Sequence, residues 1–282
     1  MKAILRLSMV PVLTIVFLLG VVCFAQAQTT IPDSALTPST QLYTDIIGGG
    51  IGSPVIMTGG GNAANVGGSA NDDGFSGPIP LGFSYTFFGN TYTSFYANNN
   101  GNISFNNGIA AYTPTGPTGA SQPIISPFFA DVDTRGLGSG LMYLRTDIPN
   151  EIIVTWDAVG YYSENFDKLD TFQLVLRGPG YTIPAGQGPI GFFYTTMQWE
   201  TGDASGGSGG FGGTPAAVGF GNGAGSGEVL QGSILPDIST IVNDEYIWFD
   251  QNLQPIGTPE PVTMLLLGLG LVGLAGVRRF KK

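Results

Sequence analysis

The sequence has almost none of the residue types that carry most catalytic and transition-metal chemistry. It contains no histidine and a single cysteine, Cys23. Catalytic triads that use histidine, and zinc sites built from histidine or cysteine, are therefore excluded. An intrachain disulfide is also excluded, because it needs two thiols. The chain must bury a core without crosslinks, and the stretch of about 230 residues between its two apolar ends is long enough to do so.

Basic residues are equally scarce in the central part of the chain. The sequence has ten lysines and arginines against twenty acidic residues. Only four of the ten lie between the two ends of the chain: Arg135, Arg145, Lys168 and Arg177. A body this acidic repels nucleic acid and anionic lipid and attracts cations. Nucleic-acid binding is therefore excluded as its function.

The N-terminal 27 residues have the pattern of a secretory signal peptide. Two basic residues precede an apolar run at residues 7–24. Ala25 and Ala27 then form a small-x-small cleavage site, which is typical of such signals. We expect the protein to be exported and cleaved after Ala27, and Cys23 to be removed with the signal peptide.

A second apolar segment lies at the C-terminus. Residues 262–277 carry no charge, and they are flanked by Pro259-Glu260-Pro261 and by a basic end at residues 278–282 that includes Arg278 and Arg279. Proline disfavours helix in the residue before it, so a helix is expected to start after Pro261. At about 1.5 Å per residue it reaches roughly 24 Å, short of the roughly 30 Å hydrocarbon core of a bilayer. The pattern predicts a short transmembrane helix that is easily released.

This arrangement resembles the PEP-CTERM sorting tail of bacterial exported proteins. The resemblance implies recognition by a membrane-embedded exosortase, removal of the tail, and delivery to the cell surface or its polysaccharide matrix. Before processing, the membrane would hold the protein through this helix, with residues 278–282 on the cytoplasmic side. An ordinary single-pass anchor is the alternative, although an anchor has no need of the Pro-Glu-Pro triplet.

The body between the two ends predicts an all-β fold. Apolar and polar residues alternate at residues 83–87 and 91–97, and Asn98–Gly101 has the composition of a turn. One face of a further strand is apolar: Ile152, Val154, Trp156 and Ala158. No segment keeps an amphipathic helical pattern for three turns. Many short strands separated by turns indicate a sandwich or a barrel.

The sequence divides into five regions. They are the signal peptide (1–27), a Gly/Pro/Ser/Thr-rich leader with the first strands (28–80), a β domain (81–250), a linker (251–258) and the sorting tail (259–282). The start of the leader, residues 28–40, is expected to be flexible. Residues 202–227, apart from a short strand at 216–220, are expected to form a long mobile loop, since glycine loses the most backbone entropy on ordering.

Linked motifs of the body resemble the NIDO domain, a nidogen-like extracellular module. The motifs that carry the resemblance are residues 95–105, 124–134, 142–145, 154–162, 171–176, 192–202 and 216–220. The resemblance implies a β-sandwich-like fold and a non-enzymatic role in cell–matrix adhesion, with exopolysaccharide or surface proteins as partners. The chain lacks the cysteine-rich modules that accompany this domain in animals, so the animal partners are not carried over.

Acidic side chains in two turns suggest a cation site. Residues 131–136 begin like a calcium loop, but an arginine and a methionine occupy two ligand positions of an EF-hand. Calcium bound between loops remains open, with Asp72, Asp73, Asp131 and Asp133 as the candidates. The alternative is that these carboxylates cap turns and pair with Arg135 or Arg145. No catalytic residue and no other cofactor is predicted.

The alternative function is a secreted polysaccharide-active hydrolase or carbohydrate-binding module. A pair of carboxylates could supply the acid and base of a glycosidase, and four lie close in sequence: Asp157, Glu164, Asp167 and Asp170. Aromatic rings could stack on sugars if exposed, and the candidates are Tyr161, Tyr162, Tyr181, Tyr194 and Trp199. Aromatic residues on strands are more often core. The main hypothesis is therefore a non-enzymatic exported surface or matrix protein.

Overall fold

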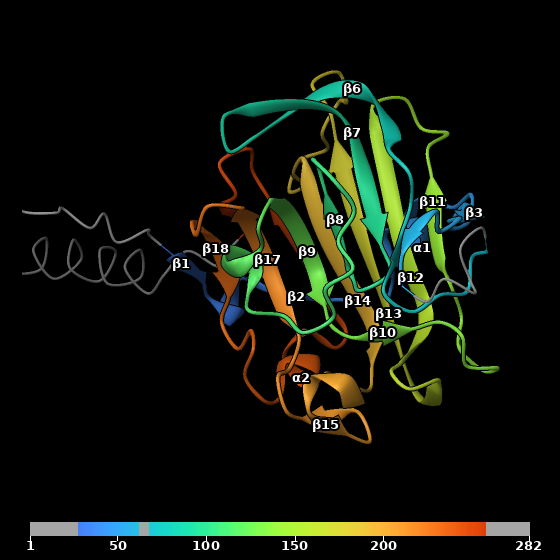
Figure 1. The fold of residues 1–282 in the computed structure, drawn as a ribbon. Coiled ribbons are helices and arrows are strands. Elements are labelled where there is room, and N and C mark those ends of the chain that lie inside the picture. The colour runs from blue at the N-terminus through green and yellow to red at the C-terminus, as the bar shows by residue number, and fades with distance from the viewer. Residues whose placement is uncertain (1–27, 62–67, 258–282) are drawn as a thin grey trace, which may run out of the picture.

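The structure is built almost entirely from β-strands. The computed structural model describes residues 28–61 and 68–257. These residues form two nine-stranded sheets and one two-stranded hairpin, and the two large sheets lie face to face (Figure 1). The helical segments are α1 (Tyr43–Ile47), α2 (Ile238–Val242) and the 3-10 turns η1 (Asp33–Ala35), η3 (Pro117–Gly119) and η4 (Asp203–Ser205). The predicted all-β class is confirmed.

The first sheet contains the β6–β7 hairpin that the alternating pattern predicted. Its strands, in order, are β1 (Gln28–Ile31), β18 (Gly227–Leu230), β17 (Ala217–Asn222), β9 (Pro123–Phe129), β8 (Asn102–Ser104), β7 (Asn90–Asn98), β5 (Gly74–Phe75) and β4 (Gly59–Gly60), with β6 (Ile79–Phe87) paired to β7. Phe88 and Gly89 connect β6 to β7 and both have positive φ. Two central residues with positive φ are typical of a tight hairpin turn.

The second sheet carries the longest strands. Its order is β2 (Thr37–Pro38), β19 (Glu245–Phe249), β14 (Ile190–Met197), β13 (Asn165–Arg177), β12 (Glu151–Tyr161), β11 (Met142–Arg145) and β3 (Ser53–Pro54), with β10 (Val132–Asp133) paired to β12 and β20 (Pro255–Ile256) paired to β19. The separate hairpin joins β15 (Gly207–Ser208) to β16 (Phe211–Gly212).

Aromatic side chains fill the space between the two sheets. The ring of Phe128 on β9 lies 5.4 Å from that of Phe172 on β13, and Phe220 on β17 lies 5.3 Å from Phe192 on β14. Trp156 stacks on Phe172 with 5.0 Å between ring centroids. All five side chains are fully buried. The domain is therefore a β-sandwich with one continuous core between its layers.

A bulge in β12 changes which residue continues the core face. Trp156 faces the core as predicted, but the pairing of β12 with β13 shifts between Trp156 and Val159. Ala158 has a φ of 50° and leaves the face, and Val159 enters the core in its place. The prediction that Ala158 extends the apolar face is wrong, because an extra residue in the strand reverses the alternation.

The outer face of the second sheet is also covered. A smaller apolar cluster joins the segment at the start of α1 to β12, β13, β14 and β19: Leu42, Tyr43, Ile153, Val175, Phe193 and Trp248. The ring of Tyr43 lies 5.6 Å from those of Phe193 and Trp248. The central strands of this sheet are therefore buried on both faces, and polar side chains on the outer face are hydrogen-bonded, as when Gln173 Nε2 donates to Thr155 Oγ1 at 2.7 Å.

A buried ion pair crosses this outer cluster. Arg177 donates from Nε to Glu151 Oε2 at 2.7 Å, and neither side chain is exposed to solvent. Arg177 also donates to the hydroxyl of Tyr43 at 2.7 Å and to the carbonyl of Gly188 at 3.0 Å. Its guanidinium lies 4.3 Å from the ring centroid of Trp248. The pair joins α1 to the two longest strands.

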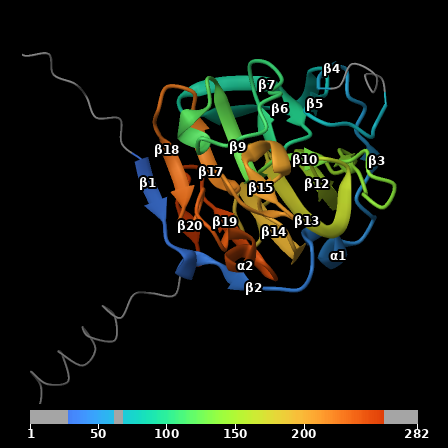
Figure 2. The same cartoon turned by 60° about the horizontal axis from the view of Figure 1, so that its bottom comes forward.

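Three segments expected to be irregular are ordered. Residues 28–40, predicted to be flexible, supply β1, which pairs in parallel with β18, and β2, which pairs with β19 (Figure 2). This prediction is wrong because backbone pairing with distant strands leaves no periodic signal in so short a segment. The linker predicted at 251–258 contains β20, which pairs with β19, up to the last described residue, Gly257.

The glycine-rich segment 202–227 is not a long mobile loop. The short strand expected at 216–220 is confirmed as β17, but the segment also contains η4 and the β15–β16 hairpin. The carbonyl of Gly210 accepts hydrogen bonds from the N–H groups of Glu200 and Thr201, at 2.8 and 3.1 Å. These backbone contacts offset the entropy that glycine loses on ordering. The prediction from composition alone is therefore wrong.

The predicted membrane segment falls outside what the structure covers. In the described ranges 28–61 and 68–257, no helix has the length and apolar character needed to cross a bilayer. The helix predicted at residues 262–277 and the signal peptide at residues 1–27 both lie outside the described residues.

The buried ion pair provides a test of the outer cluster. Replacing Arg177 by methionine should lower the free energy of unfolding by about 3–5 kcal/mol, because the carboxylate of Glu151 then stays buried without a partner. The paired variant Arg177→Met/Glu151→Leu should recover most of that loss. Guanidinium chloride unfolding of the full chain measures both. A single variant within about 1 kcal/mol of the unchanged chain would contradict a buried pair.

Candidate functional site

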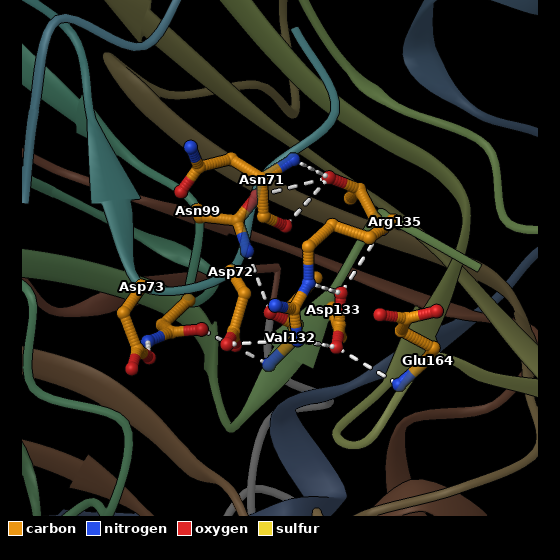
Figure 3. Close-up of polar contacts among 10 residues, drawn as sticks. Asn71, Asp72, Asp73, Asn99, Val132, Asp133, Arg135 and Glu164 are labelled. Atoms are coloured by element: carbon orange, nitrogen blue, oxygen red, sulfur yellow. Dashed lines mark hydrogen bonds and ion pairs between the residues drawn. The ribbon is translucent and has the colours of Figure 1, made fainter. Parts of the chain in front are cut away.

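Three aspartates from two distant segments meet at one end of the sandwich. Asp72 and Asp73 precede β5, and Asp131 lies between β9 and β10. One carboxylate oxygen from each residue lies within 4.8 Å of the other two. We call Asp72, Asp73 and Asp131 the aspartate cluster. Figure 3 shows Asp72 and Asp73 beside the polar residues that hold them.

The asparagine turn predicted after β7 positions this end of the molecule. Asn99 donates from its side chain to the carbonyl of Val132 at 2.5 Å (Figure 3). Asn100 accepts from the N–H of Val132 at 3.0 Å and donates to Asp73 Oδ1 at 2.7 Å. Gly101 has a φ of 72°, and a Cβ there would lie 1.7 Å from the carbonyl oxygen of Phe128. Only glycine lets the turn approach β9 this closely.

Backbone contacts hold the segment of Asp72 against β10. Asn71 donates its N–H to the hydroxyl of Thr134 at 2.7 Å, and Thr134 returns its own N–H to the carbonyl of Asn71 at 2.9 Å. Asp72 and Asp133 form an isolated antiparallel bridge between these contacts. The position of Asp72 is thereby fixed by a short ladder that the sequence pattern did not indicate.

Asp133 belongs to a separate ion pair. Its Oδ1 accepts from Arg135 Nε at 2.8 Å, and its Oδ2 accepts from Arg135 Nη2 at 2.5 Å and from the N–H of Glu164 at 2.9 Å (Figure 3). Both carboxylate oxygens are therefore occupied. Of the four calcium candidates, the structure brings Asp72, Asp73 and Asp131 together, whereas Asp133 follows the alternative interpretation and pairs with Arg135.

Asp131 is buried and has no hydrogen-bond partner. The residue is 1% exposed, and neither of its carboxylate oxygens has a hydrogen-bond partner within the described residues. Asp72 Oδ1 is likewise without a partner, while Asp72 Oδ2 lies 2.9 Å from Arg135 Nη2. A buried carboxylate without partners is rare, because the charged form loses its hydration.

Burial and mutual repulsion set the acidity of the aspartate cluster. Burial, with the neighbouring carboxylate of Asp73, raises the pKa of Asp131 to about 8. Burial, again with Asp73, raises the pKa of Asp72 to about 7, and burial raises that of Asp73. Three anions are therefore difficult to accommodate here without a positive charge between them.

A glycine closes the far side of the aspartate cluster. A Cβ on Gly202, which precedes η4, would lie 2.4 Å from Asp131 Oδ2. Real Cβ atoms do not come this close, so a larger residue would displace the carboxylate or the chain. Gly202 is a residue that sequence reasoning missed as part of the site, because it was assigned to a mobile loop.

Two of the four carboxylates considered for hydrolysis, those of Asp170 and Asp167, make structural hydrogen bonds. Asp170 is fully buried, and its Oδ1 accepts the N–H groups of Gln198 and Trp199 at 2.6 and 3.1 Å. Asp167 accepts from the hydroxyl of Tyr161 at 2.8 Å and from Lys168 Nζ at 2.6 Å. These contacts support turns and strand ends.

The aromatic residues considered for stacking on sugars do not form an exposed surface. Tyr161, Tyr194 and Trp199 are at most 1% exposed. The hydroxyl of Tyr194 donates to the carbonyl of Pro127 at 2.7 Å, and Trp199 Nε1 donates to that of Val159 at 3.0 Å. The rings belong to the core, and only Tyr162 and Tyr181 keep partial exposure.

A groove that the sequence did not predict lies beside the β6–β7 hairpin. It encloses about 720 Å³ between the tip of that hairpin and the segments that follow β13 and β19. Residues from these three regions line it, among them Phe87, Phe88, Tyr181, Ile183, Asp250 and Leu253. Phe88 and Ile183 are exposed apolar side chains. No sequence signal marks the groove, because its walls are far apart in the chain.

The Asp133–Arg135 pair yields a stability prediction. Replacing Arg135 by lysine should lower the free energy of unfolding by about 1–3 kcal/mol, because one ammonium cannot reproduce the forked contact with a fully buried carboxylate. The matched control is Lys168→Arg at the exposed pair with Asp167, which should stay within about 0.5 kcal/mol. Chemical unfolding of the full chain measures both, and equal effects at the two positions would contradict the assignment.

Comparisons with known proteins match two parts of the chain. A family model described as NIDO related matches residues 53–251, and one described as PEP-CTERM protein-sorting motif matches residues 258–279. Both resemblances read from the sequence are therefore confirmed. The first match begins before residue 81, where the β domain was expected to start, in agreement with the strands found there.

Curated relatives include alpha-tectorins from three vertebrates. The chain is 32% identical over 198 residues to alpha-tectorin of Gallus gallus, which is 60% of this chain and 9% of that protein. It is 34% and 33% identical over 180 residues to those of Mus musculus and Homo sapiens, in each case 54% of this chain and 8% of the relative. The chain thus spans less than a tenth of these relatives. No solved structure matches it.

Proposed function

The chain belongs to the NIDO-related family, and on that premise we propose that it is a non-enzymatic adhesion module of the cell surface or extracellular matrix. The observation that carries the proposal is the presence of this domain and a sorting motif in one chain. Together the two matches indicate an exported, cell-surface protein. The domain supplies the contact with matrix polysaccharide or surface proteins, and the tail supplies delivery.

The position of the tail is compatible with its removal. The last described strand, β20, ends at Ile256, and the match to the sorting motif begins at residue 258. Cleavage by an exosortase at the motif would leave every strand of both sheets in the released body. The acidic body has no charge attraction to anionic lipid, so its retention before cleavage depends on the tail.

The charge distribution limits the kind of partner. Each of the four basic side chains in the described residues already contacts a carboxylate, in the pairs Arg135–Asp133, Arg145–Asp147, Lys168–Asp167 and Arg177–Glu151. None of them is free to bind a polyanion. Direct adhesion is therefore proposed toward neutral polysaccharide or toward basic surface proteins, rather than toward acidic polymers by charge alone.

The sorting step is tested by changing the tail in a host that contains an exosortase. Removing residues 262–282 should release a folded, soluble β-domain into the medium. Changing Pro259, Glu260 and Pro261 to alanine should instead leave uncleaved protein in the membrane. Fractionation and the intact mass of the product distinguish these outcomes. Normal maturation of the triple-alanine variant would refute recognition of the motif.

The adhesion role is tested by deleting the gene. Biofilm cohesion and surface attachment should fall, and the unchanged gene should restore both while the triple-alanine variant should not. Unchanged cohesion and attachment in the deletion strain would count against adhesion. New reducing ends after incubation of the purified chain with matrix polysaccharide would favour the hydrolase alternative instead.

A further inference from the structure

We propose that the aspartate cluster binds a calcium ion that joins the segment before β5 to the turn between β9 and β10. This site is separate from the proposed adhesion function and is carried by different observations. The three carboxylates meet within 4.8 Å. Asp131 supplies the independent sign of a ligand, since it is buried, unpartnered and faces the other two.

The unpartnered oxygens of Asp131 are the central observation. Buried charges in proteins are paired, hydrogen-bonded or bound to metal. Arg135, a basic side chain close by, already serves Asp133 and Asp72. Within the described residues neither Asp131 Oδ1 nor Oδ2 makes a hydrogen bond of good geometry, and the backbone N–H of Ala204 nearby lowers the pKa of Asp131 by less than burial raises it. A cation between the carboxylates satisfies these oxygens and Asp72 Oδ1 at once.

Neighbouring contacts hold two ligands in position while leaving oxygens free. Arg135 contacts Asp72 Oδ2, so Oδ1 of the same carboxylate stays available. Asn100 donates to Asp73 Oδ1 and so fixes the direction of that side chain. Groups that orient the ligands in this way are typical of metal sites, where they set the geometry of the first coordination shell.

The chemistry of the donors favours calcium. The chain has no histidine, and its cysteine, Cys23, lies in the predicted signal peptide, so nitrogen and sulfur ligands are lacking. Carboxylate oxygens bind hard divalent cations. Magnesium is usually held by one or two carboxylates and keeps several waters, whereas calcium accepts more protein oxygens in variable geometry. Three converging carboxylates therefore fit calcium better than magnesium.

Thermal unfolding of the full chain in mild detergent, freed of metal with EDTA, tests the proposal. Calcium chloride at about one hundred times the dissociation constant should raise the Tm by about 5–10 °C, since binding to the folded state alone stabilises it. Magnesium chloride at the same concentration should give a much smaller shift. Isothermal titration calorimetry should show one calcium bound per chain.

Variants separate a metal site from a structural carboxylate. Asp131→Asn should lose the calcium shift and, in EDTA, should melt at or above the temperature of the unchanged chain, because it removes a buried charge. Asp73→Asn should also lose the shift, which keeps the test valid if Asp131→Asn does not fold. The control Asp33→Asn, an exposed carboxylate in η1, should keep the full shift.

Two results would overturn the proposal. One is an unchanged chain whose Tm and calorimetric signal do not respond to calcium, which would mean that protonation alone stabilises the cluster. The other is a calcium shift that Asp131→Asn and Asp73→Asn both retain, which would place the ion elsewhere on this acidic surface.

Discussion

The packing of aromatic rings between the two sheets is the interaction on which the rest of the structure depends. With its single cysteine, the chain cannot form an internal disulfide. Phe128, Phe172, Phe192 and Phe220 are each fully buried across the sheet interface. Burial of such a side chain contributes about 1.5–3 kcal/mol. A sandwich of this size can therefore hold together through its core alone, and the loops at its ends are free to carry acidic side chains.

The second constraint is the shortage of positive charge inside an acidic domain. Arg177 and Arg135 each compensate a carboxylate that is fully shielded from solvent, Glu151 and Asp133. Removal of either partner leaves the other charge uncompensated, so these pairs specify the arrangement of the strands more than they add net stability. Asp131 is buried to the same degree without such a partner. That asymmetry distinguishes the aspartate cluster from the structural ion pairs.

The sequence predicts features whose pattern lies within one short segment, and it does not predict contacts between distant segments. Alternation identified β6, β7 and β12, and the run Asn98–Gly101 correctly indicated a turn. The pairing of β1 with β18 joins residues about two hundred positions apart, and no pattern in either short segment predicts it. The candidate site shows the same contrast between local patterns and long-range contacts. Aspartates mark a turn locally, but only the ladder between Asn71 and Thr134 decides that Asp72 and Asp73 meet Asp131. For Asp133 the sequence left calcium binding and pairing with Arg135 open, and the structure shows the ion pair.

The strand order of the second sheet separates the aspartate cluster from the groove. β2 and β20 both pair with β19, on the edge opposite β14, so the last described strand lies at this edge of the sheet, whereas the first, β1, pairs with β18 in the other sheet. β10, beside the aspartate cluster, pairs with β12, three strands from β19. Strands lie about 4.8 Å apart, and β10 lies beyond β12, so four spacings place β10 roughly 19 Å from β19. The groove near Asp250 and Leu253 lies beside β20. The aspartate cluster beside β10 and the groove beside β20 are therefore separated across the width of the sheet.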